Sequence, residues 1–501
     1  MDAPVPLIVA ALLAAAALVA PSSRGRAWAM LAALVLAPAI LVAHISSSDQ
    51  VAPLRHHPAR LAAVVVAGVV VVVALAVLFH RRPAALPVAA VATLPFRVPI
   101  ATGGSTANLL VPLYLVVAGG ALAYLVPRLG GEPVDDGLAD VSPGVLDWLL
   151  GLSVALYGIQ AAYSSDFGRA LENVVFFYVP FALLFALLRR VVWTPTLLRA
   201  CLGVLVCLAL VLAGIGFVEY ATRHVFLNPK VIASNQLEDY FRVNSLFFDP
   251  NIYGRFLAIV MILVTGWLLW AARRRDVIVA AAILAVLWAA LVLTFSQSSF
   301  TALLVGLAVL GGLRWNPRRA LVLAVAAVVV AAAFVAVSPS TVRLQLGSSK
   351  SANQATSGRY ALVKGGASLF KDHPIAGYGS GSFPREYRRK EKVSAQRATS
   401  ASHTIPITVA AEQGVIGLAL YVALLAAAFG RLFRRARSSV ARASVAAAFA
   451  ALVVHTLMYA AFLEDPLTWT LLGVAVALAA QAPPEHRRPR VQVGEPAAAA
   501  V

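Results

Sequence analysis

Two arginines and one histidine stand in polar stretches of a chain that is otherwise largely apolar. Arg242 precedes a long apolar run, Arg359 lies in a long polar loop, and His403 lies where that loop meets the next apolar run. An arginine at a membrane interface is often a plain headgroup anchor. A histidine there is suited to accept a proton near neutral pH. These three side chains are therefore the candidates for binding an anion and for accepting a proton.

The polar loop, residues 338–403, carries eleven basic and three acidic residues, and the excess of +8 predicts a polyanionic partner. Its basic residues are Arg343, Lys350, Arg359, Lys364, Lys371, Arg385, Arg388, Arg389, Lys390, Lys392 and Arg397. An amphipathic helix is predicted to begin at Ser357–Tyr360 and to end before Pro374. The predicted apolar face consists of Tyr360, Val363, Ala367 and Phe370. Arg359 in the first turn opposes the helix dipole, which favours a role other than helix stability.

Other polar residues near these positions have simpler explanations. Asp249 or Asn251 is predicted to cap the helix that begins at Pro250. The glycine-rich turn 377–381 could bind phosphate through its backbone amides, although such a turn is more often an ordinary loop. Glu412 lies two to three turns beyond His403 within an apolar run, where a carboxylate is costly and tends to be functional or paired.

Composition indicates the class of protein. The chain has 501 residues, of which 60% are hydrophobic and 13% charged, against roughly 25% charged in an ordinary soluble domain. The net charge of +19 does not indicate nucleic-acid binding, because the aromatic residues lie in apolar runs and many arginines lie at the ends of those runs. We expect no cofactor and no metal site, since no Asp-x-Asp motif occurs in the predicted external loops.

The apolar runs predict an all-α polytopic membrane protein with about 12–15 transmembrane helices. They lie near 5–20, 27–44, 61–79, 84–101, 108–126, 144–162, 170–188, 197–220, 252–271, 277–295, 299–313, 320–337, 404–429, 441–462 and 466–481. The pair 84–101 and 108–126 contains prolines and a Gly-Gly turn, so it is expected to be less regular than two plain spans.

Arginines recur in every second connection, which by the positive-inside rule makes those connections cytoplasmic. Residues 223–251, 296–299 and 338–403 are then predicted to lie outside, with the large loop between the fourth- and third-from-last span blocks. The predicted divisions are N-terminal spans (1–241), a second transmembrane block (242–337), the external loop (338–403), three C-terminal spans (404–482) and a disordered cytoplasmic tail (483–501).

The ordered set of motifs resembles the O-antigen ligase and O-antigen polymerase family of the bacterial envelope. The matching segments are Arg242 with Asp249-Pro250-Asn251, Thr294–Ser299, Ser357–Tyr360, Pro374–Phe383, Ser402-His403-Thr404 and Glu412–Leu418. The resemblance covers about 242–430, and the N-terminal half matches only as generic spans. Two departures are Gln297 and Thr404, where the family usually has Arg and Asn.

This resemblance implies glycosyl transfer from a polyprenyl-diphosphate-linked oligosaccharide to a lipid or glycan acceptor, at the outer face of the plasma membrane. Arg242 and Arg359 would neutralise the departing diphosphate, and His403 would take the acceptor proton, giving inversion without a metal. The residues expected at the substrate are Arg242, Arg359, Tyr360, Asn251, Glu412, Arg385 and Arg388.

Two other functions stay open on the sequence. A transporter or lipid-linked oligosaccharide flippase would carry charged or broken helices at mid-membrane, whereas in-span charge here is expected mainly at Glu219 and Glu412. A membrane scaffold would use its basic loop to hold anionic lipid or cell-wall polymer and would not need His403. The glycan, the acceptor, and the choice between ligase and polymerase are not encoded in these motifs.

Overall fold

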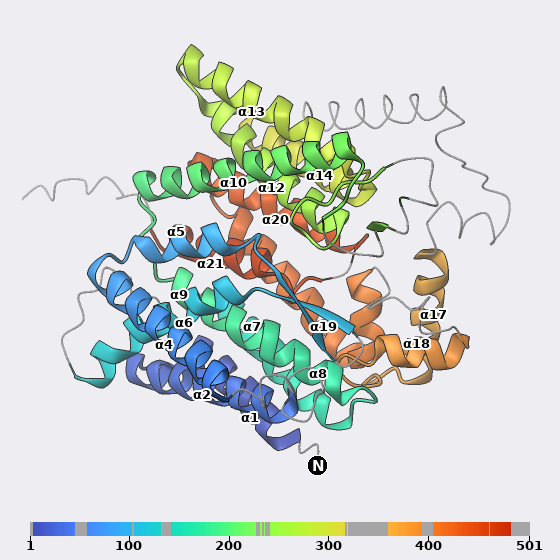
Figure 1. Cartoon of the computed structure of the whole chain (residues 1–501). Helices are drawn as coiled ribbons and strands as arrows, with labels where there is room; N and C mark the ends of the chain where they lie inside the picture. The colour runs from blue at the N-terminus through green and yellow to red at the C-terminus, as the bar shows by residue number, and fades with distance from the viewer. Residues whose placement is uncertain are drawn as a thin grey trace, which may run out of the picture.

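A computed structural model describes residues 4–45, 58–102, 105–131, 142–226, 231–232, 235, 241–315, 318, 359–392, 404–459 and 461–481. Within them the chain is a bundle of apolar helices with one short β-hairpin (Figure 1). Ten described helices are long and apolar enough to cross a membrane, and three shorter apolar helices join them. The sum of ten and three lies within the predicted 12–15, and the chain is an all-α multi-pass membrane protein.

The helix bounds follow the apolar runs closely. The N-terminal helices are α1 (Pro4–Val19), α2 (Ser23–Ile45), α4 (Pro58–Arg81), α6 (Val111–Leu129), α7 (Val145–Gln160, followed by η1, Ala161–Tyr163), the continuous run of α8 (Phe167–Asn173), η2 (Val174–Tyr178) and α9 (Val179–Leu188), and α10 (Pro195–Thr222). The later ones are α12 (Pro250–Trp270), α13 (Arg274–Leu293), α14 (Gln297–Arg314), α19 (Ile405–Phe433), α20 (Val440–Thr456, preceded by η3, Ala436–Ser438) and α21 (Pro466–Ala480). The predicted run 320–337 lies outside the described residues.

The predicted span 84–101 is wrong. Its place is taken by α5 (Ala85–Thr93), which has 9 residues and so extends only about 14 Å at 1.5 Å per residue. A hairpin of β1 (Val98–Thr102) and β2 (Ser105–Leu109) follows, with Val98 opposite Leu109 and Thr102 opposite Ser105. An apolar run alone cannot separate a span from a half-length helix plus a strand, because both bury the same residue types.

Glycines allow close packing of the helices that carry the site. A Cβ at Gly254 of α12 would lie 2.6 Å from Ser299 Oγ of α14, and one at Gly306 of α14 would lie 2.2 Å from Ile262 of α12. Membrane helices associate through such small-residue contacts, since lipid supplies no hydrophobic drive between them. Helices α12, α14 and α20 therefore form a tight group in which polar side chains are shielded.

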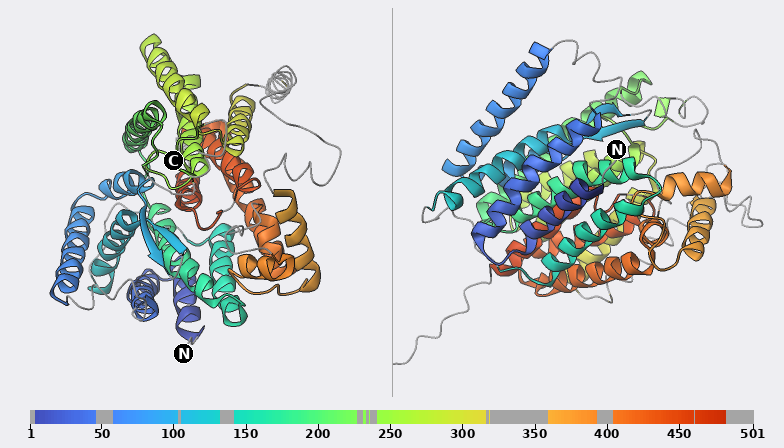
Figure 2. Two further views of the ribbon diagram at one scale, coloured as in Figure 1. Left: turned by 45° about the vertical axis from the view of Figure 1, so that its right-hand side comes forward. Right: turned by 90° about the horizontal axis from the view of Figure 1, so that it is seen from below.

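Two short helices, α17 (Arg359–Asp372) and α18 (Phe383–Glu391), lie together at one end of the bundle (Figures 1 and 2). We call this the loop end. The first residues of α12, α14, α19 and α21 and the last of α20 also meet there. The opposite end carries Arg314 and Arg437, whose side chains donate to Leu269 O and Gly312 O.

Candidate active site at the loop end

Arg242 lies against the first turn of α12 and the C-terminal end of α13. Its Nε donates to Thr294 O at 3.0 Å, and its Nη2 donates to Asn251 Oδ1 at 3.4 Å. The side chain of Asp249 caps α12 by accepting from Asn251 N at 2.6 Å, as predicted. The structure therefore brings together Arg242 and Asn251, two of the residues that the motifs select.

Asn251 belongs to a buried polar network with three serines and one histidine. Ser296 Oγ donates to Asn251 Oδ1 at 2.8 Å and lies 2.8 Å from Ser299 Oγ and 3.2 Å from Ser298 Oγ. Both of those hydroxyls lie within 3.3 Å of His455 Nε2 of α20. The histidine and the serines are fully buried, so this network joins three helices in a dry environment.

The segment that holds Arg242 is fixed by a carboxylate from α10. Glu219 accepts hydrogen bonds from the backbone amides of Asn244 at 3.1 Å, Ser245 at 2.7 Å and Phe226 at 3.2 Å. Val243 N also donates to Leu293 O at 3.1 Å, next to the carbonyl that Arg242 contacts. Glu219 thus has a clear structural function, which its position in the sequence did not reveal.

A second arginine faces the same region one turn further along α12. Arg255 forms a fully buried ion pair with Asp465, the residue that caps α21, and Arg97 lies within electrostatic reach of both. Asn251 and Arg255 are four residues apart, so their side chains lie on one face of the helix. The expectation that in-span charge is confined mainly to Glu219 and Glu412 is wrong, because Arg255 and Asp147 also lie within spans, each in a buried ion pair with a residue at the end of another helix.

His403 lies outside the described residues, and of Arg359 only the helical backbone is described. The residue that follows His403, Thr404, is described: its Oγ1 donates to Leu457 O at 3.1 Å, just beyond the end of α20. Leu457 is two residues from His455, so the first turn of α19 enters the bundle beside the serine network. The convergence of Arg242, Arg359 and His403 remains a prediction.

The glycine-rich turn binds the protein itself. Tyr378 N and Gly379 N donate to Ala411 O and Glu412 O of α19, and Gly381 N and Phe383 N donate to the Glu412 carboxylate at 2.9 and 3.1 Å. The turn therefore uses these four amides to dock α18 on α19, and they are not available to a phosphate. A carboxylate at the start of α18 also complements the dipole of that helix.

Docking the turn requires glycine at a break in α19. Gly414 has φ +65°, and a Cβ there would lie 2.1 Å from Ile375 O, while Gly377 has φ +69° and faces Glu412 in the same way. Val415 N donates to Pro374 O at 2.7 Å across this break. Residues 374–379 thus run alongside 411–415, which explains why both motifs are rich in glycine.

The apolar face predicted for α17 is wrong, although the predicted extent of the helix is right. The residues that pack inward are Leu362, Gly365, Gly366 and Leu369, and Tyr360 is 46% exposed. A Cβ at Gly365 would lie 2.4 Å from Tyr387 and one at Gly366 would lie 2.5 Å from Ile407. Because these glycines let α18 and α19 approach so closely, the face of α17 that contains them is the buried one. Side-chain hydrophobicity alone does not predict this face.

Two further basic residues expected at the substrate lie on α18. Arg385 is exposed and its Nη1 donates to Ser165 O, beyond the end of α7. Arg388 is half-buried. Their roles at the substrate stay predictions, as do those of Tyr360 and Glu412.

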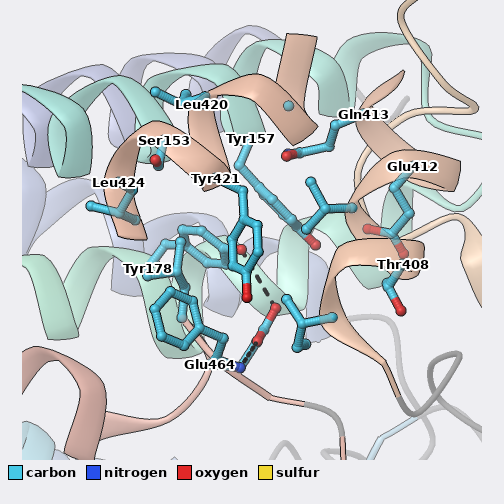
Figure 3. A pocket seen from close by; sticks show the side chains of 15 residues that line it. Ser153, Tyr157, Tyr178, Thr408, Glu412, Gln413, Leu420, Tyr421, Leu424 and Glu464 are labelled. Atoms are coloured by element: carbon cyan, nitrogen blue, oxygen red, sulfur yellow. Dashed lines mark hydrogen bonds between the residues drawn. The ribbon is translucent and has the colours of Figure 1, made fainter. Parts of the chain in front are cut away.

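A cavity of about 50 Å³ lies between α7, η2, α19 and the segment 462–464 (Figure 3). It has room for a few water molecules. Tyr178, Tyr421 and Glu464 point toward one another in it, and Tyr178 OH donates to Glu464 Oε1 at 3.5 Å. Burial raises the pKa of the Glu464 carboxyl. Glu412 and Gln413 line the same cavity from α19.

Sequence reasoning missed His455, Asp465 and Glu464. Glu464 and Asp465 stand between two apolar runs, where polar residues are usually interfacial, and His455 is a lone histidine inside the run 441–462 with no distinguishing pattern. The weak signal available was the pair Glu464-Asp465 followed by Pro466, since adjacent acidic residues are rare in this basic chain.

Comparison with known proteins agrees with this organisation. Residues 282–422 match the family model described as O-Antigen ligase, a segment that runs from α13 through α14 and the described loop helices into α19. No curated protein matches the chain. The matched segment contains Ser296, Ser298, Ser299 and Glu412, and it supports lipid-linked glycan transfer as the general class of activity. Residues 282–422 of this chain are thus similar to the O-antigen ligase family.

Proposed function

We propose that this protein transfers a glycan from a polyprenyl-diphosphate carrier to an acceptor hydroxyl at the outer face of the plasma membrane. The observation that carries the proposal is the joint placement of Arg242, Asn251 and the entry of α19 at the loop end. Arg242 contacts Asn251, and Thr404 contacts the end of α20, whose His455 belongs to the same network. These contacts connect the segment that follows His403 to the guanidinium through a chain of intervening residues, which supports the proposal.

In the proposed reaction the acceptor oxygen attacks the anomeric carbon, and the bond from that carbon to the diphosphate oxygen breaks. The acceptor proton passes to His403, and the diphosphate departs with its lipid. Arg242 and Arg359 neutralise the charge that develops on the leaving oxygen. One displacement at the anomeric carbon inverts its configuration, and the guanidinium groups supply the positive charge in this scheme.

The test uses the full chain reconstituted with a polyprenyl-diphosphate glycan and its acceptor, with release of polyprenyl diphosphate as the readout. His403→Ala is expected to lower turnover by about 10²-fold or more. Arg242→Lys is also expected to reduce turnover, because an ammonium cannot form the paired contacts of a guanidinium. Arg389→Ala is the control, since that side chain is 70% exposed and pairs only with Glu386 among the described residues.

Retention of wild-type turnover by His403→Ala would overturn the catalytic assignment. The flippase alternative makes a different prediction, namely movement of labelled donor across vesicles in the absence of any acceptor. Because in-span charge is more abundant than the sequence indicated, it no longer argues against a transporter. The flux assay therefore decides between the two functions.

A further inference from the structure

We infer that His455 is a positioning residue that holds Arg242 in its working orientation through the serine network and Asn251. The inference rests on the proposed function, because it assigns Arg242 to the donor diphosphate. His455 lies in α20, outside the segment 282–422 that matches the family model, and no motif selects it.

The path from His455 to Arg242 consists of short contacts throughout. His455 Nε2 lies 3.2 Å from Ser298 Oγ, which lies 3.2 Å from Ser296 Oγ. Ser296 Oγ donates to Asn251 Oδ1 at 2.8 Å, and the same oxygen accepts from Arg242 Nη2 at 3.4 Å. His455 and the serines are 0% exposed, so water does not compete for these hydrogen bonds.

A parallel branch fixes the backbone of the same asparagine. Ser299 Oγ lies 3.3 Å from His455 Nε2 and donates to Asn251 O at 3.3 Å. With the single ring proton on Nε2, the histidine donates to one of the two serine hydroxyls at a time, and the hydrogen bonds run from that hydroxyl toward Asn251. Each hydroxyl has one proton and can also accept, so it can pass this direction along.

The direction matters because an amide side chain has two different ends. Asn251 Oδ1 can accept from a guanidinium, whereas its Nδ2 would face Arg242 as donor against donor. The donation from Ser296 keeps the oxygen on the side of Arg242. Removing His455 leaves the hydroxyls free to reorient, and the amide then loses the constraint that aims the guanidinium.

A merely structural role for His455 predicts a loss of stability alone, whereas positioning predicts a specific kinetic pattern. We expect His455→Ala to raise KM for the donor several-fold and to lower kcat about tenfold, with KM for the acceptor unchanged. His455→Gln should restore most of the activity, since its amide reaches the position of Nε2, and His455→Asn should not.

Coupling to Asn251 gives a second readout. The double variant His455→Ala with Asn251→Ala is expected to be no worse than Asn251→Ala alone, because both changes break one path. Ser444→Ala is the matched control: it removes a buried polar group three turns away on the same face of α20, and it should behave as wild type.

The experiment measures both glycan transfer and the binding of inorganic diphosphate by the full chain. One outcome is that the wild-type protein transfers no glycan but binds diphosphate, and that His455→Ala weakens this binding. That outcome would disprove the proposed reaction and support the positioning role of His455. Wild-type kinetics for His455→Ala, or equal activities for His455→Gln and His455→Asn, would overturn the positioning. If His455→Ala does not fold, the Gln and Asn comparison and Ser298→Ala carry the test. Wild-type protein that neither transfers nor binds would remove both proposals.

Discussion

The ion pair between Arg255 and Asp465 joins α12 to the N-terminus of α21 at the loop end. Asp465 caps α21 through Leu467 N at 2.8 Å and at the same time neutralises Arg255 of α12, and both side chains are 1% exposed. A buried charge without a partner is costly, whereas a pair replaced by apolar groups is often tolerated. The pair therefore fixes the 461–465 segment against α12.

We predict that Asp465→Ala destabilises the protein by roughly 3–5 kcal/mol, because it leaves the Arg255 charge buried and unpaired. The double variant Arg255→Met with Asp465→Leu should recover most of that loss. Thermal unfolding in detergent, monitored by the circular dichroism of the helices, measures both. An Asp465→Ala protein that melts with the wild type would show that Arg255 finds another anion.

Single residues also mark the limit of sequence reasoning. Asp249 and Asn251 were identified because a cap and a turn have local signatures, and the structure confirms the cap. His455 was not identified, because its partners lie 156 and 157 residues away and nothing local requires them. Chemistry that depends on distant partners leaves no periodic trace in a single sequence.

Two segments at the loop end are held in the same way, by an in-span carboxylate that accepts hydrogen bonds from their backbone amides. Glu219 of α10 holds residues 244–245, and Glu412 of α19 holds Gly381 and Phe383. Each carboxylate thereby gains charge-assisted hydrogen bonds that offset part of its cost in the membrane. These hydrogen bonds therefore help packing to hold the two segments in place.

We predict that Glu412→Gln loosens residues 378–392 and leaves residues 241–249 unchanged. Loss of one charge-assisted hydrogen bond costs about 1.5–3 kcal/mol, so amide exchange in the first segment should accelerate by roughly tenfold to a hundredfold. Glu219→Gln is the matched control and should produce the converse pattern. Hydrogen–deuterium exchange read by mass spectrometry measures both, and equal exchange in both variants would contradict the anchoring role.

At the level of elements, the sequence predicted where helices begin and end better than it predicted which face of a helix is buried. The bounds of α12, α14 and α17 follow directly from apolar runs, caps and Pro374. The predicted buried face of α17 was wrong because Gly365 and Gly366 determine the face by allowing neighbouring helices to approach closely, and not through apolar side chains of their own. The span expected at 84–101 was wrong because a half-length helix and a hairpin share its composition.

On the scale of the whole molecule, the polar residues divide between the two ends of the bundle. The loop end collects Arg242, the serine network and the helices α17 and α18, and the opposite end collects the arginines that connect successive spans. From the positive-inside rule we predict that the arginine-rich end is cytoplasmic. The proposed transfer requires this orientation, because its lipid-linked donor is presented at the outer face.

We predict that a cysteine at position 389 is labelled from outside intact cells and one at position 434 is not. The background carries Cys201→Ser and Cys207→Ser, and both test positions are exposed arginines at opposite ends of the bundle. A membrane-impermeant maleimide should modify Arg389→Cys directly and Arg434→Cys only after the membrane is permeabilised. The reverse result would place Arg242 on the cytoplasmic side, since α17, α18 and the Arg242 segment lie at one end of the same bundle. Transfer at the outer face would then be excluded even if every contact in the serine network were correct.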